Sequence, residues 1–332
     1  MPPELRAAVE PPAVVGMNTW QRPRVTALYT WIIAIFAPSA SFFILSAPSL
    51  GEAGMRGVPV AIAVLTFLLS VLMGLTSFSN PGVIPLPVTR QDRKDLPSHA
   101  LVAGRTVPLK YCPVCAMGRP PRASHCRETD RCIEKWDHYC PWVGTAIGRR
   151  NYHWFFCFLT CALGLAALLG IAALEHLWIV AAVIHGSSAS SPPPPLAPSH
   201  AGGPAMSLAS WPLALHAAAL APASCILLVY SAIVSLLLGM LVTYHAYLVA
   251  RNETTYENVR GQFADAGSNP FDQGWLRNFG EVFCSPCVPP VRWVPHDESN
   301  ERESGTQRHH QHQVELSAAA AAVPPLAERH SV

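Results

Sequence analysis

The chain has 332 residues, of which 50% are hydrophobic and 13% charged, with a formal net charge of +2. Charged residues usually make up about 25% of a soluble domain, so this composition excludes an ordinary soluble protein and indicates a membrane protein.

Four uncharged apolar runs are long enough to cross a bilayer, which needs about 20 residues. They span residues 25–47, 58–78, 154–174 and 220–250. The third run meets Glu175 and His176 and then continues as apolar sequence to Ile184. Buried helices of a soluble core explain four such runs poorly. We therefore predict an all-α integral membrane protein with four transmembrane helices and a small domain between the second and third spans.

Basic residues are distributed unevenly between the segments that connect the runs. Segments 1–24, 79–153 and 251–332 hold 3, 12 and 7 of them, together 22 of the 23. Because lysine and arginine stay preferentially in the cytosol, we predict that these segments and both termini are cytosolic. The compartment is expected to be an endomembrane (Golgi or endoplasmic reticulum) or the plasma membrane.

These features predict six regions. They are a cytosolic amino-terminal segment, two spans, a cytosolic cysteine-rich domain, two spans around a proline-rich lumenal loop, a cytosolic carboxyl-terminal segment and a tail. The expected boundaries are 1–24, 25–78, 79–153, 154–250, 251–295 and 296–332. The tail is polar and then alanine-rich, so we expect it to be disordered.

Cysteines gather in the 79–153 segment with the spacing Cys112-x2-Cys115-x9-His125-Cys126-x5-Cys132. In the reducing cytosol such a pattern favours zinc over disulfides. The most economical tetrahedral ligand set is Cys112, Cys115, His125 and Cys132. A thioredoxin-type redox pair is the alternative for Cys-x2-Cys, but the proline-rich surroundings offer no strand-to-helix setting. Bound zinc would stabilise a segment with too few apolar residues to fold alone.

A candidate nucleophile follows the zinc ligands, in the sequence Asp137-His138-Tyr139-Cys140-Pro141-Trp142. A cysteine attacks as its thiolate, which needs a base or a positive neighbour. His138 is the nearest candidate base, and Asp137 can orient its imidazole, as in a serine-type triad. The alternative is that Cys140 is a fifth zinc-binding cysteine.

Five stretches together resemble one family, in the expected order and on the expected side of the membrane. They are residues 80–82 (Asn-Pro-Gly), 119–126, 137–144, 254–257 (Thr-Thr-Tyr-Glu) and 269–275 with Asn278. Together they resemble the DHHC-type protein S-acyltransferases, or palmitoyltransferases, here with Tyr139 in place of the second histidine. The likeness covers residues 25–284.

The resemblance implies a two-step reaction. Cys140, assisted by His138 and Asp137, would attack palmitoyl-CoA or a similar acyl-CoA, carry the acyl group as a thioester and pass it to a cysteine of a substrate protein. Expected partners are acyl-CoA, the lipid bilayer and membrane-associated proteins with cytosolic cysteines; no nucleic acid is expected. Trp142 would cover the thioester. Arg149 and Arg150 would either hold CoA phosphates or anchor the third span.

Members of this family usually hold two zinc ions, each by three cysteines and one histidine. The positions of the second set are Cys126, Thr129, Tyr139 and Ala146, so three of its four ligands are missing together. We therefore predict one zinc ion, with ordinary packing in place of the second.

Three functions compete. The first is a protein-cysteine S-palmitoyltransferase, and the second is a catalytically inactive relative that acts as a zinc-binding membrane scaffold. The third is a membrane ubiquitin ligase, which the missing second metal site and the Asp-His-x-Cys sequence both disfavour. Thr255 and Glu257 are expected to tie the fourth span to the catalytic domain by hydrogen bonds. Asn278 is expected to cap or brace the carboxyl-terminal helix against the spans.

Overall fold

Four apolar helices make up most of the computed structural model, which describes residues 25–87, 89–188, 211–264, 269–284 and 293–296. The proline-rich loop and the tail were predicted in parts of the chain that lie outside these residues. The chain divides into two units, residues 1–88 with 122–290 and residues 89–121 with 291–332. All four long helices belong to the first unit.

The prediction of four spans is confirmed. Among the described residues, the helices long and apolar enough to cross a membrane are Thr26–Leu45, Gly57–Phe78 (α4), Tyr152–His185 within α5 (Tyr152–Ser188) and Pro222–Ala250 (α7). The first consists of α1 (Thr26–Thr30), a π-helical stretch η2 (Trp31–Phe36) and α2 (Ala37–Leu45). A short helix α3 (Ala47–Glu52) follows it.

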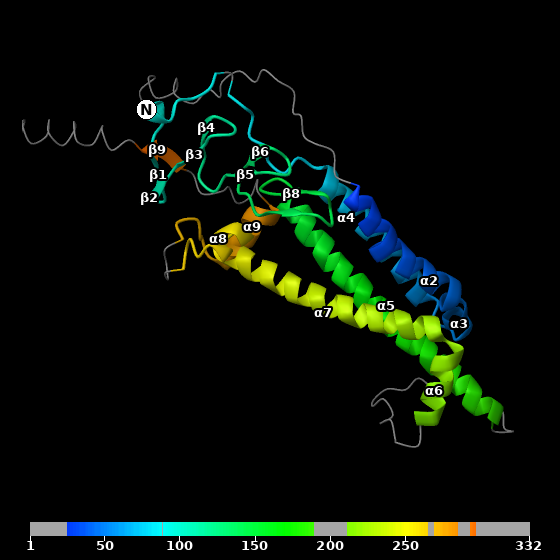
Figure 1. Cartoon of the computed structure of the whole chain (residues 1–332). Coiled ribbons are helices and arrows are strands. Elements are labelled where there is room, and N and C mark those ends of the chain that lie inside the picture. Colours follow the sequence, from blue (N-terminus) through cyan, green and yellow to red (C-terminus); the bar gives the residue numbers. More distant parts are fainter. Residues whose placement is uncertain (1–24, 88, 189–210, 265–268, 285–292, 297–332) are drawn as a thin grey trace, which may run out of the picture. The chain divides into compact units, whose positions relative to one another are not determined.

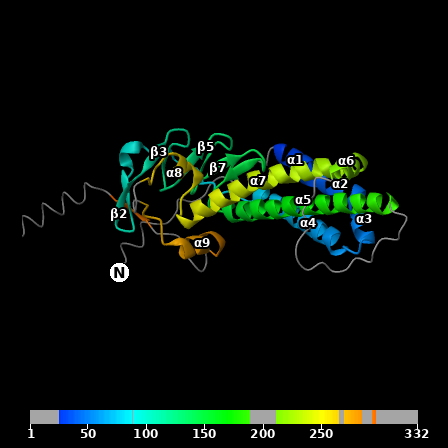
Figure 2. The ribbon, with the colours of Figure 1, turned by 90° about the horizontal axis from the view of Figure 1, so that it is seen from below.

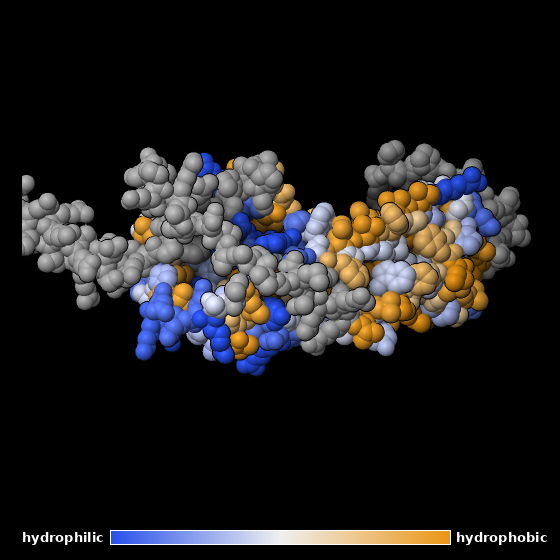
Figure 3. Space-filling model, turned by 90° about the horizontal axis from the view of Figure 1, so that it is seen from above, coloured by the Kyte–Doolittle hydropathy of each residue, from blue (hydrophilic) through white to orange (hydrophobic). Residues whose placement is uncertain are grey.

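Large apolar side chains cover much of the face of these helices that Figure 3 shows. Large side chains such as Ile33, Phe67 and Ile226 are 67%, 72% and 71% exposed. A contiguous apolar surface of this kind is unfavourable in water and is suited to lipid. Inside the bundle, α5 and α7 lie side by side along much of their length (Figures 1 and 2).

Two helix boundaries differ from the predicted runs, for identifiable reasons. Helix α5 passes through Glu175 and His176 without a break, because the His176 ring turns into the bundle, where its Nδ1 lies 2.7 Å from Ser224 Oγ. The last run, 220–250, begins two residues before its helix, because Leu220 ends a separate helix α6 (Trp211–Leu220), Ala221 is not helical and Pro222 begins α7. Proline suits the first turn, where its missing N–H is not needed.

Short strands, which the sequence patterns did not predict, form the cysteine-rich segment. In the second unit, β2 (Arg105–Pro108), β1 (His99–Val102) and β9 (Trp293–His296) form a sheet in that order, and β3 (Lys110–Cys112) pairs with β4 (Met117–Arg119). In the first unit, β5 (Ser124–Cys126) pairs with β6 (Arg131–Ile133), and β7 (His138–Cys140) pairs with β8 (Thr145–Ile147). Most of these strands have only three residues, too few for a recognisable alternation.

The segment after the fourth span folds back onto it. Helix α8 (Thr255–Val259) begins with a capping box made by Thr254 and Glu257. Helix α9 (Trp275–Phe283) carries Asn278, whose Nδ2 donates to Ala250 O at the end of α7 (2.7 Å). The expected role of Asn278 as a brace is confirmed.

The junction between the hairpins and the third span converges on Gly148. A Cβ atom at this position would lie 2.5 Å from Ile133 Cγ2, 2.6 Å from Pro81 O and 3.0 Å from Glu134 O. Backbone carbonyls cannot move aside cheaply, so only glycine fits between β8 and α5.

Gly148→Ala should therefore lower the free energy of unfolding by about 1–3 kcal/mol, the usual effect of overpacking. The matched control is Gly164→Ala on α5, where no atom lies within 4 Å of the added methyl group. Thermal unfolding in detergent should show a lower midpoint for the first variant and an unchanged or slightly higher one for the second. Equal midpoints would contradict this packing.

Candidate active site

The β7–β8 hairpin holds the candidate nucleophile. Its register pairs Cys140 with Thr145, across a turn in which Gly144 has φ +68° and donates its N–H to Pro141 O (3.2 Å). Asn151 fixes the hairpin to the bundle, because its Nδ2 donates to Ala146 O on β8 and to Thr76 O on α4 (3.0 and 3.3 Å). The hairpin therefore stands at one end of α4 and α5.

Cys140 is buried, with 6% of its surface exposed. It belongs to the apolar cluster of the bundle, which here includes Val143, Ile147 and Phe155. The thiol is free of any disulfide. A nucleophile in these surroundings is close to the membrane-spanning helices and shielded from bulk water.

Asp137 receives three hydrogen bonds. Its Oδ2 lies 2.6 Å from His138 Nδ1 and accepts from Thr255 Oγ1 at 2.8 Å, while its Oδ1 accepts from Thr255 N at 2.7 Å. Burial favours the neutral acid, but the hydrogen bond to His138 and the nearby positive charge outweigh it and lower the pKa of Asp137. The carboxylate is therefore charged and fixed in orientation. The contact expected of Thr255 is present.

His138 is held between this carboxylate and the thiol. Burial alone would lower its pKa, but the hydrogen bonds to Asp137 and to Cys140 raise the pKa of His138 from 6.5 to about 9. Its ring also packs edge to face on Phe155, with centroids 5.2 Å apart. At neutral pH the imidazole is protonated and can stabilise the thiolate of Cys140 as an ion pair.

Two residues that the sequence analysis missed lie beside His138, on α7 and at the start of α5. His245 on α7 lies with its ring 6.1 Å from that of His138, and its Nδ1 is 2.9 Å from the hydroxyl of Tyr152 at the start of α5. A histidine within a predicted span is uncommon and marks a functional position by default. That signal was present in the sequence.

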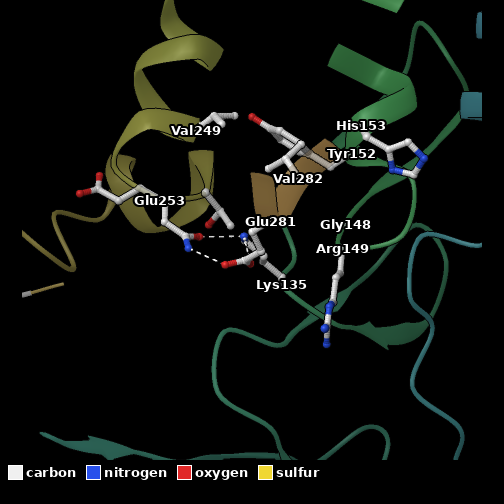
Figure 4. Close-up of a pocket in the computed structure, with 11 residues that line it drawn as sticks. Lys135, Gly148, Arg149, Tyr152, His153, Val249, Glu253, Glu281 and Val282 are labelled. Carbon is white, nitrogen blue, oxygen red and sulfur yellow. Dashed lines mark hydrogen bonds and ion pairs between the residues drawn. The ribbon is translucent and has the colours of Figure 1, made fainter. Parts of the chain in front are cut away.

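A buried ionic network places Thr255 beside Asp137. Arg122 binds both carboxylate oxygens of Glu257 (2.8 and 2.6 Å) and the Oδ1 and O atoms of Asn252 (2.9 and 2.7 Å). Lys135 donates to Asn252 Oδ1 and to Glu281 Oε1, both at 2.8 Å (Figure 4). Burial and the neighbouring Arg122 lower the pKa of Lys135 to about 8, although Glu281 opposes the shift.

Three members of this network have left-handed backbone conformations. The φ angles of Arg122, Lys135 and Asn252 are +66°, +44° and +49°. Such conformations cost about 1–3 kcal/mol each in non-glycine residues and persist only where the surroundings impose them. The expected tie made by Glu257 is confirmed, whereas its partner Arg122 was missed because it lies 135 positions away in the sequence.

The predicted metal ligands fall in both units, two in each. Cys112 and Cys115 belong to the second unit, where Cys115 N donates to Cys112 Sγ at 3.4 Å. His125 and Cys132 belong to the first unit, where they are direct cross-strand partners on β5 and β6. Within the described part of the chain these four residues are the one group of His and Cys side chains that could hold a metal ion. Three sulfurs and one imidazole are a donor set that suits tetrahedral zinc.

The positions of the lost second set are filled by packing. Cys126, Ile133 and Ala146 form a buried cluster, against which Trp136 and Tyr139 lie. Burial raises the pKa of the Cys126 thiol, and Glu128 adds to this effect while Thr129 opposes it. The neutral thiol is therefore favoured at this position.

The remaining candidate residues lie on the surface. Trp142 is 67% exposed. The side chains of Arg149 and Arg150 are 46% and 54% exposed, and both pair with Glu134, at 3.9 and 3.5 Å. Arg149 lines a pocket with Lys135, His153 and Glu281, and Figure 4 shows its guanidinium extending away from the Lys135–Glu281 pair.

Comparisons with known proteins point to one family. The family model described as DHHC palmitoyltransferase matches residues 105–262. Probable protein S-acyltransferase 5 of Arabidopsis thaliana is 36% identical over 250 residues, covering 69% of this chain and 47% of that protein. Palmitoyltransferase ZDHHC18 of Mus musculus is 30% identical over 284 residues, covering 78% and 67%. Palmitoyltransferase ZDHHC8 of Homo sapiens is 33% identical over 257 residues, covering 76% and 29%. The aligned part of the chain thus covers between under a third and two thirds of the length of each of these relatives.

The Asp137–His138 pair should make stability depend on pH in a defined direction. Because folding raises the pKa of His138 to about 9, its contribution is complete below pH 6.5 and is lost as pH rises through 9. Asp137 is charged throughout this range, since its pKa is below 3.8. We expect Asp137→Asn to be less stable than wild type by on the order of 3 kcal/mol near pH 6.5.

Thermal midpoints of wild type and Asp137→Asn, measured from pH 6 to 10, should converge above pH 9. Asp95→Asn, at an exposed aspartate, should follow wild type at every pH. If the thermal midpoint of wild type exceeds that of Asp137→Asn by the same amount at every pH, His138 does not titrate against this carboxylate.

Proposed function

Because the chain belongs to the DHHC palmitoyltransferase family, we propose that it is a protein S-acyltransferase. In this proposal a fatty acyl group, palmitoyl in the first instance, moves from acyl-CoA to a thioester on Cys140 and then to cysteines of membrane-associated proteins. The observation that carries the proposal is the arrangement of Asp137, His138 and Cys140, with a 2.6 Å contact between the first two and with the last two on the same face of strand β7.

The residues divide the chemistry as follows. Asp137 accepts the Nδ1–H of His138, which leaves Nε2 for Cys140, and the imidazole holds the proton of that thiol in a thiolate–imidazolium pair. The thiolate of Cys140 attacks the thioester carbonyl of acyl-CoA, the bond from that carbonyl to the CoA sulfur breaks, and the imidazolium returns the proton to the departing thiolate. In the second half-reaction His138 takes the proton from a substrate thiol, which attacks the acyl-Cys140 carbonyl and releases Cys140.

Zinc has a structural part in this proposal. Cys112, Cys115, His125 and Cys132 would hold one ion, and the chemistry that zinc supplies there is a cross-link between short strands that cannot bury a core of their own. No reacting atom needs to touch the metal. The packing around Cys126 supports one ion rather than two.

Acyl-CoA is proposed to approach along the basic surface beside the third span. Arg149 and Arg150 would bind the phosphates, exchanging their shared partner Glu134 for a doubly charged group. Trp142, exposed beside the nucleophile, would cover the thioester. The acyl chain would lie among the helices next to Cys140.

The protein is a multi-pass membrane protein. The distribution of basic residues supports cytosolic termini and the domain boundaries 1–24, 25–78, 79–153, 154–250, 251–295 and 296–332. We place it in an endomembrane (Golgi or endoplasmic reticulum) or the plasma membrane, where acyl-CoA and client cysteines meet at the cytosolic face.

Cys140→Ser should abolish the hydroxylamine-labile acyl label that purified protein acquires from radiolabelled palmitoyl-CoA, and with it transfer to a client cysteine, because a serine hydroxyl forms no thioester. Cys225→Ser, at a free cysteine on α7, should keep both activities. If wild type carries no such label, the inactive scaffold is the correct function instead. If Cys140→Ser keeps it, the nucleophile is another cysteine.

Purified protein should contain one zinc ion per chain by mass spectrometry. Cys132→Ala should lose the metal and lower the thermal midpoint, because the site contributes folding energy. Cys126→Ala, at a buried cysteine outside the cluster, should keep it. Two ions per chain, or retention by Cys132→Ala, would contradict the assigned ligands.

A further inference from the structure

Thr145 is the cross-strand partner of Cys140, and its hydroxyl group is buried without an evident use. The residue is 2% exposed. Its Oγ1 has no hydrogen-bond partner among the described residues. Buried hydroxyl groups almost always have a hydrogen-bond partner. A buried hydroxyl group that has none, opposite the candidate nucleophile, therefore requires an explanation.

The position of Thr145 brings its side chain close to the sulfur. Directly opposite residues of an antiparallel pair project from the same face of the sheet, with Cβ atoms about 4.5–5.5 Å apart. Cys140 and Thr145 are such a pair. A hydroxyl at this separation can reach the carbonyl oxygen of an acyl group that is bonded to Cys140 Sγ.

Polar groups of the hairpin and of its junction with α5 are already engaged. The Gly144 N–H donates to Pro141 O. The Asn151 amide donates to Ala146 O and Thr76 O. The His138 imidazole is held by Asp137, and the buried cluster to which Cys140 belongs is apolar. A negative oxygen formed here would be poorly stabilised without a further hydrogen bond.

We propose that the hydroxyl of Thr145 donates a hydrogen bond to the oxyanion that forms when a thioester carbonyl is attacked at Cys140. The inference rests on the proposed function. As the Cys140 sulfur bonds to the carbonyl carbon, the π electrons move onto the oxygen, and they return when the bond to the CoA sulfur breaks. The same oxygen becomes negative again when a substrate thiolate attacks acyl-Cys140, so Thr145 serves both half-reactions.

Three variants separate this role from packing. Thr145→Val keeps the shape and removes the hydroxyl, Thr145→Ser keeps the hydroxyl, and Ser77→Ala removes another buried hydroxyl that lacks a partner in the described structure. In single-turnover acylation by palmitoyl-CoA, Thr145→Val should be slower than wild type by about 10²–10³-fold, as for the loss of one oxyanion donor. Thr145→Ser should stay within about tenfold, and Ser77→Ala should match wild type.

Two further measurements on the same samples identify the step. Alkylation of Cys140 by iodoacetamide develops no oxyanion, so Thr145→Val should react at the wild-type rate. Its thermal midpoint should be unchanged or higher, since a buried hydroxyl without a partner gives way to a methyl group. A purely structural role predicts a lower midpoint instead.

Acylation of Thr145→Val at the wild-type rate would overturn the inference. A parallel fall in acylation and alkylation would also overturn it, because Thr145 would then act on the thiol. If wild type forms no acyl-Cys140, the proposed function fails and this inference fails with it. A labelled wild type with an unimpaired Thr145→Val refutes the inference alone.

Discussion

The buried carboxylate of Asp137 is the constraint on which the rest of the site depends. A charged group that is 1% exposed is tolerated only if its hydrogen bonds are satisfied. Here the donors come from His138 and from both the backbone and the side chain of Thr255. One carboxylate therefore joins the β7–β8 hairpin to the segment that follows the fourth span.

The buried ionic network fixes the position of the segment that carries Thr255. Arg122 and Lys135 extend from the cysteine-rich segment to Glu257 and Glu281. Asn252 is hydrogen-bonded to Arg122, Lys135 and Glu281. Buried ion pairs add little net stability, because desolvation offsets most of their attraction. They do specify one arrangement, and in this chain that arrangement places α8 where Thr255 reaches Asp137.

Much of the architecture could be predicted from the sequence, because long apolar runs and metal-ligand spacing are local patterns. The four spans, the Cys112–Cys132 ligand cluster and the contact of Thr255 with the catalytic segment all follow from such patterns or from the family resemblance. The break before Pro222 could also have been predicted from the proline alone. By contrast, His176 did not end α5, since Ser224 on another helix satisfies it.

The remaining parts of the site depend on contacts between distant segments. Nothing near Asn252 in the sequence indicates that Arg122 and Lys135 bind it, and three-residue strands such as β7 and β8 leave no periodic signal. The register that sets Thr145 opposite Cys140 is fixed by the turn and by Asn151, so it appears only in three dimensions. His245 differs, because its place within a span was visible in the sequence, whereas its closeness to His138 was not.

The most direct test of the central claim is intact-mass analysis of the purified protein after incubation with palmitoyl-CoA, followed by mapping of the modified peptide. The account predicts a single palmitoyl thioester on Cys140 that is discharged when a client thiol is added. A protein that stays unmodified, or an adduct on another cysteine while Cys140 is free, would contradict it.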